Sequence, residues 1–452
     1  MNITLFALIL FAVSYILLIA FQKYRPYIAL ASAAVFTIIG STGLFPEFSY
    51  TVSDALYNID WNVLLMIIGM MGTVYLFTET GMADKMSNVL VSKAGTVGWS
   101  VIILSLFAGV ISAFLDNVAT VLMVAPIALA ICKNNKISPV APLICIAISS
   151  NLQGAATLVG DTTSILLAKA AQLDFLDFFM DERHLGMFFV TEAGALASAV
   201  FLWLMFRKEK QKVVIDTSVV VKDYFPTVML VLTIVTLIAV SFIPYEDLAE
   251  PGQFYKPDIS NGLICMFFFL IGVIRKMIVT KDISFLKKLA GEIDWFTLLL
   301  LAGLFVVIGA IDRAGVIAQV GNLMSGLAGD GSRGSVFLIY TVIVWGSVLI
   351  SAFVDNIPYV VTMLPIIAVL GINLKAIGAA GAPTQLLYYG LLCGATLGGN
   401  LTPIGASANV AALGILRKEG YTVSNTEFMK YGVPFTLIAV TVGYVLLWLV
   451  WM

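Results

Sequence analysis

Long apolar runs separated by short polar segments make up most of the chain. A helix needs about 20 apolar residues to cross a bilayer. Runs of that kind lie near 1–21, 26–44, 61–77, 185–206, 224–243, 259–274, 294–313 and 432–452. The polar/apolar alternation typical of membrane β-barrel strands is not visible. The pattern predicts an all-α polytopic membrane protein.

Two further apolar stretches, 98–132 and 335–372, are too long for a single crossing. A straight helix over the first would measure about 52 Å at 1.5 Å per residue, against a hydrocarbon core of about 30 Å. Each stretch carries an Asp-Asn pair near its centre, Asp116-Asn117 and Asp355-Asn356. We predict two re-entrant hairpins that turn at these pairs. Asp also suits the N-cap of each second arm.

Two discontinuous helices are predicted at 138–172 and 385–416. Glycines and hydroxyl residues interrupt the first within 153–164, and the second contains GGNLTPIGASAN at 398–409. Backbone that leaves a helix at membrane depth is tolerated only where protein or water satisfies its polar groups. Such breaks therefore indicate a polar site inside the membrane.

The two halves of the chain resemble each other. The hairpin centres SAFLDNVATVLMVAP and SAFVDNIPYVVTMLP agree at seven of fifteen positions. Asp60-Trp61 and Asp294-Trp295 open equivalent spans, and Gly81 and Gly315 share the same offset of 234 residues. We divide the chain into N-terminal scaffold helices (1–60), repeat 1 (61–212), further scaffold helices (213–293) and repeat 2 (294–452).

The basic residues predict the orientation, because cytoplasmic loops carry an excess of Lys and Arg. With Lys23 and Arg25 inside, nineteen basic residues fall inside and five outside. Lys169, within the first broken helix, either pairs with an acid or extends to the interface. This threading gives about eleven transmembrane helices plus two hairpins, the first entering from the cytoplasm and the second from outside. Both termini are predicted outside, in a multi-pass protein of the plasma membrane.

Composition agrees with this class and narrows the chemistry. The 452 residues are 60% hydrophobic and only 12% charged, and the mean hydropathy is +1.01. The single histidine, His184, argues against a His-based metal site or catalytic triad. The four scattered cysteines are expected to be small buried hydrophobes. The net charge of −2 gives no sign of a nucleic-acid partner, and none is expected.

The Asp-Asn pairs are the strongest candidates for function. An Asp at the bilayer centre costs about 2.5–3.5 kcal/mol. Carboxylate and amide oxygens suit Na⁺, and a buried carboxylate can carry a proton. The alternative is that the pairs only cap the hairpin arms, and both roles can coexist. We expect no Arg or Lys beside either hairpin tip, which argues against a large polyanion, although half-helix dipoles can substitute for a basic residue.

The candidate ion- and substrate-binding residues come from the hairpin tips and the helix breaks. They are Asp116, Asn117, Thr120, Thr157, Gly160, Asp161, Thr162, Ser164, Asp355, Asn356, Asn400, Thr402, Gly405, Ser407 and Asn409. Asn117 and Asn356 are expected to ligate Na⁺ together with Asp116 and Asp355. No cofactor other than bound Na⁺ is expected.

At these motifs the sequence resembles the ion transporter superfamily, in particular the group of arsenite permeases, NhaD-type antiporters and melanosomal P proteins, which are citrate-transporter-like permeases. The resemblance covers nearly the whole chain. It implies that the hairpins and broken helices form a mobile transport domain, held by a scaffold that is often dimeric, with an elevator-type motion. It also implies that the tips and breaks hold the ion and substrate sites.

The first break departs from the pattern of that group. The group usually carries Gly-Asp-Pro-Pro-Asn, whereas this chain has Gly160, Asp161, Thr162, Thr163 and Ser164. A hydroxyl therefore replaces the Asn amide in the first half, while Asn409 keeps the amide in the second.

These observations predict a secondary active transporter for a small inorganic ion or small anion, with Na⁺ or H⁺ coupling. The aspartates favour Na⁺/H⁺ exchange or proton-coupled efflux. An arsenite or organic-anion permease and, in another class, a passive ion channel are the alternatives. An enzyme is not expected, because Val159-Gly160-Asp161 departs from the Gly-x-Gly-Asp pattern of intramembrane aspartyl proteases. Membrane lipid and a second copy of the chain are the expected partners.

Overall fold

The computed structural model describes residues 2–212, 220–248, 253–326, 329, 331–379, 381 and 383–452. Within these ranges the regular structure is almost entirely helical. The strands found there are β1 (Met180–Asp181) and β2 (His184–Leu185), which form one short antiparallel pair. Nine of the described helices are long and apolar enough to cross a membrane, judged by length and composition. The prediction of an all-α membrane protein is confirmed.

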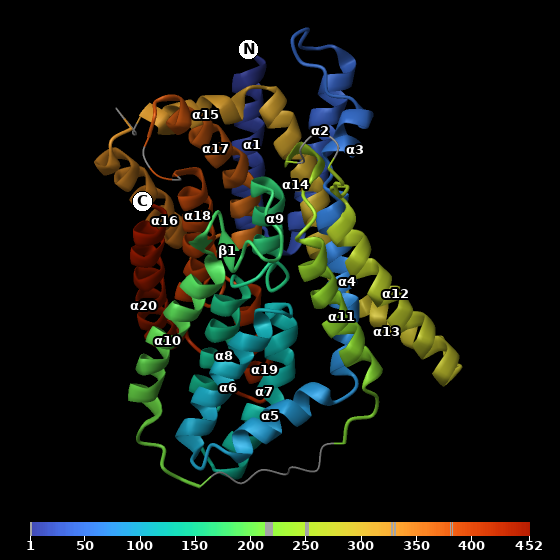
Figure 1. Cartoon of the computed structure of the whole chain (residues 1–452), viewed down its shortest axis with the longest axis vertical. Helices are drawn as coiled ribbons and strands as arrows, with labels where there is room; N and C mark the ends of the chain where they lie inside the picture. The colour runs from blue at the N-terminus through green and yellow to red at the C-terminus, as the bar shows by residue number, and fades with distance from the viewer. Residues whose placement is uncertain are drawn as a thin grey trace.

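The helices follow the same order in both halves of the chain (Figure 1). The first half contains α1 (Ile3–Ala20), α2 (Arg25–Thr42), α3 (Val52–Asn58), α4 (Trp61–Thr78), α5 (Met82–Ser92), α6 (Val97–Ser112), α7 (Asn117–Asn134), α8 (Val140–Gly154), α9 (Thr162–Ala171) and α10 (Met187–Phe206). The second half contains α11 (Phe225–Val240), α12 (Ser260–Thr280), α13 (Phe285–Glu292), α14 (Trp295–Arg313), α15 (Val316–Gly326), α16 (Arg333–Ser351), α17 (Asn356–Ala376), α18 (Pro383–Gly398), α19 (Ser407–Lys418) and α20 (Asn425–Trp451). Short 3₁₀ turns occur at η1 (Gln22–Tyr24), η2 (Glu246–Leu248) and η3 (Gly399–Leu401).

Matched local details show that the repeat is structural. Asp60 and Asp294 cap α4 and α14, each accepting a backbone N–H from three residues ahead at 3.0 Å. Gly81 and Gly315 turn the chain out of these helices at φ 77° and 76°, a left-handed conformation that glycine adopts without strain. The following helices, α5 and α15, lie near opposite ends of the molecule in Figure 1. The repeat also reaches further than its sequence signal, because α1–α3 and α11–α13 occupy equivalent places in the order.

Each half contains a helical hairpin wrapped around a broken helix. Residues 113–116 connect α6 to α7, and residues 352–355 connect α16 to α17. The helix α8 packs against both α6 and α7, and α18 packs in the same way against α16 and α17. Almost every residue of α8 and α18 is buried. The broken helices therefore form the core of the molecule.

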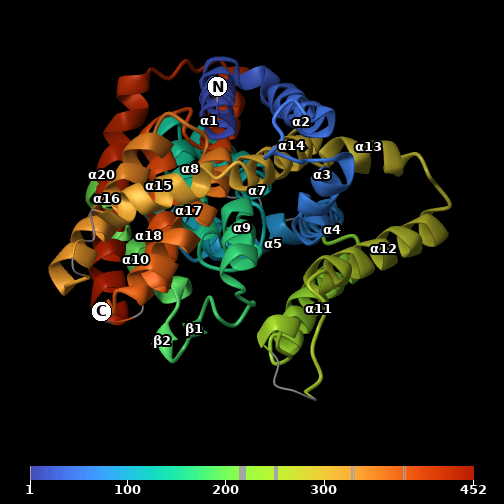
Figure 2. The same cartoon turned by 90° about the horizontal axis from the view of Figure 1, so that it is seen from above.

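Two helix pairs stand beside this core. The helix α4 packs against α12 and α11, while α14 packs against α2, so each half supplies a partner to the other. Viewed from above, α11 and α12 lie at the periphery, on the far side of α4 from the hairpins (Figure 2).

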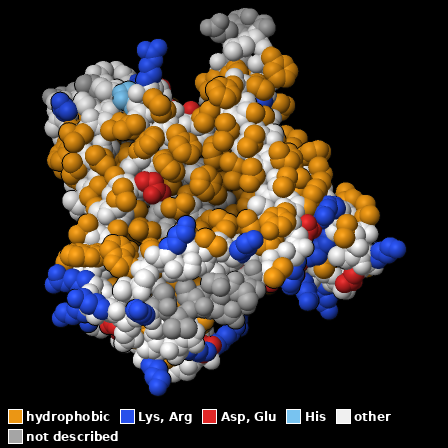
Figure 3. All heavy atoms as spheres, turned by 60° about the horizontal axis from the view of Figure 1, so that its bottom comes forward, with side chains coloured by type: hydrophobic (Ala, Val, Ile, Leu, Met, Phe, Trp, Pro, Cys, Tyr) orange, Lys and Arg blue, Asp and Glu red, His pale blue; other side chains and the backbone are white. Residues whose placement is uncertain are grey.

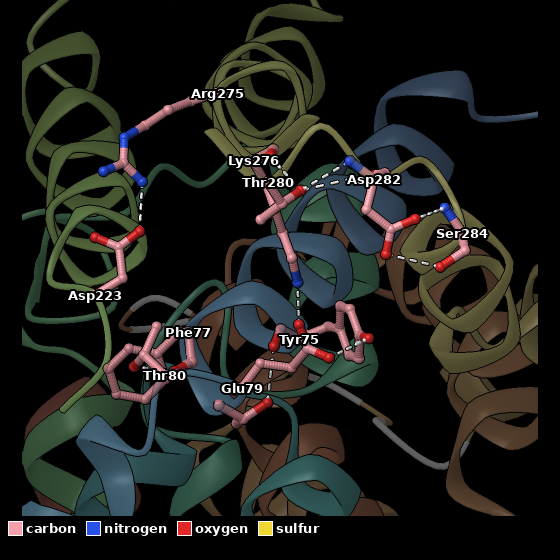
Figure 4. Close-up of polar contacts among 11 residues, drawn as sticks. Tyr75, Phe77, Glu79, Thr80, Asp223, Arg275, Lys276, Thr280, Asp282 and Ser284 are labelled. Carbon is pink, nitrogen blue, oxygen red and sulfur yellow. Dashed lines mark hydrogen bonds and ion pairs between the residues drawn. The ribbon is translucent and has the colours of Figure 1, made fainter. Parts of the chain in front are cut away.

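Polar contacts fix α12 to α4 at one end (Figure 4). Lys276 forms an ion pair with Glu79, and the Tyr75 hydroxyl donates to Glu79 at 2.6 Å. In the loop after α12, hydrogen bonds from the backbone N–H and the hydroxyl of Ser284 lower the pKa of Asp282.

The surface is divided by polarity. Figure 3 brings forward the end of the molecule that lies at the bottom of Figure 1. Lys and Arg side chains gather around that end and on the part that projects at the right of the picture. Hydrophobic side chains cover a broad area beyond them. A belt of this kind fits the hydrocarbon layer of a bilayer, with the basic end in water.

Candidate functional site

Each hairpin tip lies against the helix break of its own half. The Thr157 hydroxyl donates to the Ala113 carbonyl of the first tip, and the Thr402 hydroxyl donates to the Ala352 carbonyl of the second. The predicted N-caps are also present. Asp116 Oδ2 accepts the N–H groups of residues 118 and 119 at 3.0 Å, and Asp355 Oδ1 accepts that of residue 357 at 3.2 Å. Capping is therefore a real role of both aspartates, and it leaves ion binding open.

Glycine is required where each break meets its tip. A Cβ on Gly160 would lie 2.5–2.8 Å from the carbonyl oxygens of residues 154, 112 and 113. A Cβ on Gly405 would lie 2.5–3.0 Å from those of residues 399, 351 and 352. These are backbone atoms, which cannot move aside as a flexible side chain can. Three backbone carbonyl oxygens therefore lie close to a glycine at equivalent places in both halves.

A chain of amides joins the two breaks. The Asn117 amide donates to Asn151 Oδ1 at 3.0 Å. Asn151 in turn donates to Asn400 Oδ1 at 3.1 Å and to the Thr396 carbonyl at 2.8 Å, and Asn400 donates to the Ile148 carbonyl at 2.9 Å. Asn151 and Thr396 were not among the predicted site residues. The signal that the sequence offered for Asn151 was an Asn within the apolar run that forms α8.

Asp161 makes the two breaks unequal. Its side chain is only 5% exposed and accepts a hydrogen bond from the Thr163 hydroxyl at 2.9 Å. That hydroxyl also lies 2.9 Å from the hydroxyl of Thr396. The equivalent position in the second half is Ala406. Neither Asp161 nor Ala406 provides a side-chain cap for the helix that follows it.

A cavity of about 500 Å³ opens at this meeting point. Seven predicted residues line it, namely Asp116, Asn117, Gly160, Asp161, Thr162, Asn356 and Ser407. Its other wall comes from α4 (Ile67, Met70, Met71) and from residues 291–297 at the junction of α13 and α14. That wall adds the carboxylates of Glu292 and Asp294, which sequence reasoning did not assign to the site. Among the described residues that line it are four carboxylates and no Lys or Arg.

The remaining predicted residues lie behind the cavity wall. Asn409 donates to the carbonyls of Gly399 and Thr402 at 3.1 and 3.2 Å, so its amide spans the second break. Ser164, at the equivalent position, is fully buried, and its hydroxyl finds no partner among the described residues. The Thr120 hydroxyl is likewise buried without a partner there. The first break therefore lacks the side-chain amide that bridges the second break.

One sequence expectation about the tips is wrong. Arg25, at the start of α2, forms an ion pair with Asp355 at 2.9 Å, and its side chain is only 8% exposed. Its Nε also donates to the Leu18 carbonyl at 3.1 Å. Beside it, the Tyr15 hydroxyl donates to the Pro358 carbonyl at 2.6 Å. A basic residue does lie beside the second tip, because the fold brings together residues 330 positions apart.

A smaller cavity of about 260 Å³ lies on the other side of α9. Lys169 lines it and pairs with Asp258 at 2.7 Å, which resolves the alternatives left open for this lysine. Ile165 lines both cavities.

Comparison with known proteins identifies relatives along nearly the whole chain. A family model described as a citrate transporter matches residues 15–394. An uncharacterized transporter of Mycobacterium tuberculosis is 31% identical over 449 residues, covering 98% of this chain and 97% of that protein. The human P protein is 28% identical over 479 residues, covering 92% of this chain and 56% of the P protein.

Two solved structures share the fold. The YdaH transporter of Alcanivorax borkumensis matches with a TM-score of 0.57 at 14% identity, covering 95% of this chain and 97% of that one. MtrF of Neisseria gonorrhoeae, described as one of a class of antimetabolite efflux pumps, matches with a TM-score of 0.56 at 13% identity, covering 95% and 94%. The resemblance inferred from the motifs is confirmed.

Proposed function

We propose that this chain, which belongs to the citrate transporter (CitMHS) family of the ion transporter superfamily, is a secondary active transporter coupled to Na⁺ or H⁺. The observation that carries the proposal is the acidic cavity at which two hairpin tips and a helix break from each repeat meet. Secondary transporters commonly build their sites from discontinuous helices at the interface of inverted repeats.

Coupling to a cation is supported by the charge of this cavity. Asp116 and Asp161 line it together with Glu292 and Asp294, and its lining contains no basic side chain to balance them. Carboxylate, amide and backbone carbonyl oxygens are the ligands that a hard cation prefers. The same carboxylates can also hold a proton. This favours Na⁺/H⁺ exchange or proton-coupled efflux.

A citrate-like organic anion is the second candidate. The helices α9 and α19 begin without side-chain caps, and Thr162 and Ser407 of their first turns line the cavity. Free N–H groups at a helix start attract anions, and the volume of about 500 Å³ exceeds the need of a single ion. Such an anion would enter an acidic cavity only with its charge balanced by bound cations.

The arrangement also supports an elevator-type motion. In this proposal α1, α2, α4, α11, α12 and α14 form the scaffold, and the hairpins, broken helices, α10 and α20 form the transport domain. With each broken helix counted once, ten segments cross the membrane. An even number of crossings puts both termini on the same side, in agreement with the prediction that both are outside. The sequence estimate of about eleven crossings is odd and would put them on opposite sides. The homodimer and the plasma-membrane location stay predictions.

Transport against a gradient in proteoliposomes tests the proposal. An imposed Na⁺ or pH gradient is expected to drive uphill substrate or counter-ion flux, whereas a channel gives downhill flux only. We expect Asp116→Asn and Asp161→Asn each to abolish coupled flux while the protein still inserts. Asp282→Asn, in a loop remote from the cavity, is the matched control and should keep it. Unchanged coupling in both cavity variants would contradict the proposed role of these carboxylates.

A further inference from the structure

We propose that the coupling cation binds in repeat 1 alone, at Asp116 and Asp161, and that Arg25 takes the place of a second cation in repeat 2. This inference rests on the proposed function and deepens it. It gives the transporter one exchangeable cation site where the sequence repeat predicts two.

The two halves differ in charge at equivalent positions. Repeat 1 presents two carboxylates, Asp116 and Asp161, to the cavity, and the cavity lining holds no Lys or Arg. In repeat 2 the tip aspartate, Asp355, lies outside the cavity lining and pairs with the guanidinium of Arg25, and Ala406 stands in place of Asp161. Counted over these equivalent tip and break positions, the formal charge is −2 in the first half and zero in the second. Glu292 and Asp294 add two further negative charges to the cavity wall. An added cation is attracted only where the negative charge is uncompensated.

The oxygen atoms of the two tip aspartates are used differently. Asp355 Oδ1 accepts the N–H of residue 357, and its Oδ2 accepts a hydrogen bond from Arg25. Asp116 Oδ2 accepts both capping N–H groups, those of residues 118 and 119. Its Oδ1 accepts no hydrogen bond from any residue in the described ranges. Asp116 therefore keeps one oxygen without a contact in the described ranges, whereas both oxygens of Asp355 are engaged and its charge is balanced by Arg25.

In the conformation of this structure, Arg25 is held firmly beside Asp355. Its side chain is 8% exposed, and Nε is anchored on the Leu18 carbonyl while Nη1 contacts Asp355. Tyr15 of α1 holds the same hairpin through the Pro358 carbonyl. Displacing a buried guanidinium would leave an uncompensated charge, which is strongly unfavourable. A free cation therefore does not compete for this position.

Cation-dependent thermal stability of the purified protein tests the inference, because a ligand that binds only the folded state raises its unfolding temperature. NaCl is titrated against choline chloride at fixed ionic strength and pH, and pH is titrated in a sodium-free buffer. Wild type should respond to one of these cations, and at saturating concentrations its unfolding free energy should rise with ln[cation] at the slope expected for one bound cation. Asp161→Asn should remove the response.

Variants of the ion pair separate the two halves. Arg25→Met/Asp355→Asn keeps the second tip neutral and should retain the wild-type midpoint within about threefold. Arg25→Met alone exposes Asp355 and should raise this slope toward that of two bound cations. Arg25→Lys keeps the charge and should behave as wild type.

Two results would overturn the inference while leaving the proposed function intact. They are loss of the cation response in the double variant, and a wild-type slope that corresponds to two bound cations. The absence of any cation response in wild type, together with purely downhill flux, would overturn the proposed function and this inference with it.

Discussion

At the scale of single residues, Asn151 connects the two halves of the site. Its side chain is fully buried, accepts from Asn117 and donates to Asn400 and to the Thr396 carbonyl. A buried amide with its partners arranged in this way specifies one relative position of the two breaks. The residue therefore supports the cavity without lining it.

Replacing Asn151 by Ala should destabilise the protein, by about 1–3 kcal/mol for each buried polar group left without a partner. The loss is measured as a lower unfolding temperature of the detergent-solubilised protein. Asn135→Ala is the matched control, because that amide caps the end of α7 on the Ile131 carbonyl and is only half-buried. Equal unfolding temperatures for the two variants would show that the amide chain adds nothing.

At the scale of elements, each helix break is formed by close packing of its loop against a hairpin tip. Three backbone carbonyl oxygens surround the Cα of Gly160, and three surround that of Gly405. The break is therefore imposed by tertiary contact as well as by local sequence. It also places the starts of α9 and α19 beside the tips, which the proposed ion and substrate sites require.

Gly160→Ala and Gly405→Ala should each displace a hairpin tip, since the added Cβ would meet backbone atoms at 2.5 Å. Overpacking of this kind costs about 1–3 kcal/mol, read as a lower unfolding temperature. If the coupling cation binds in repeat 1, Gly160→Ala should also weaken the cation response more than Gly405→Ala.

Gly346→Ala in α16 is the control for this pair, because a Cβ there meets nothing within 4 Å. It should be neutral or slightly stabilising, since Ala favours a helix over Gly. Unfolding temperatures that do not distinguish Gly160→Ala from Gly346→Ala would contradict the close-packing argument.

At the scale of the whole molecule, the two ends of the protein differ in the helix that lies there and in the basic side chains around it. The helices α5 and α15 lie near opposite ends in Figure 1, and basic side chains gather around the end that carries α5. The large cavity and the small one share Ile165 as a lining residue. In the proposed orientation the α5 end faces the cytoplasm.

Labelling with a membrane-impermeant maleimide on intact cells tests this orientation. All four native cysteines are buried, so a single introduced cysteine provides the reactive site. Lys93→Cys, after α5, should react only after the cells are opened, because the α5 end is inside. Lys375→Cys, at the end of α17, should react from outside; both positions are exposed. Labelling of both from the same side would contradict the inverted arrangement.

The sequence by itself determined the elements and most of the candidate residues, because apolar run length, capping residues and glycines act locally. The helix breaks, the Asp116 and Asp355 caps and the turns at Gly81 and Gly315 all lie where these signals put them. Tertiary structure alone decided which groups meet. Arg25 reaches Asp355 across 330 positions, and Asn151 reaches Asn400 across 249. Such contacts depend on the packing of whole repeats, so periodicity and motifs that matched the two halves could not reveal that Arg25 neutralises the second tip and leaves the first without a basic partner.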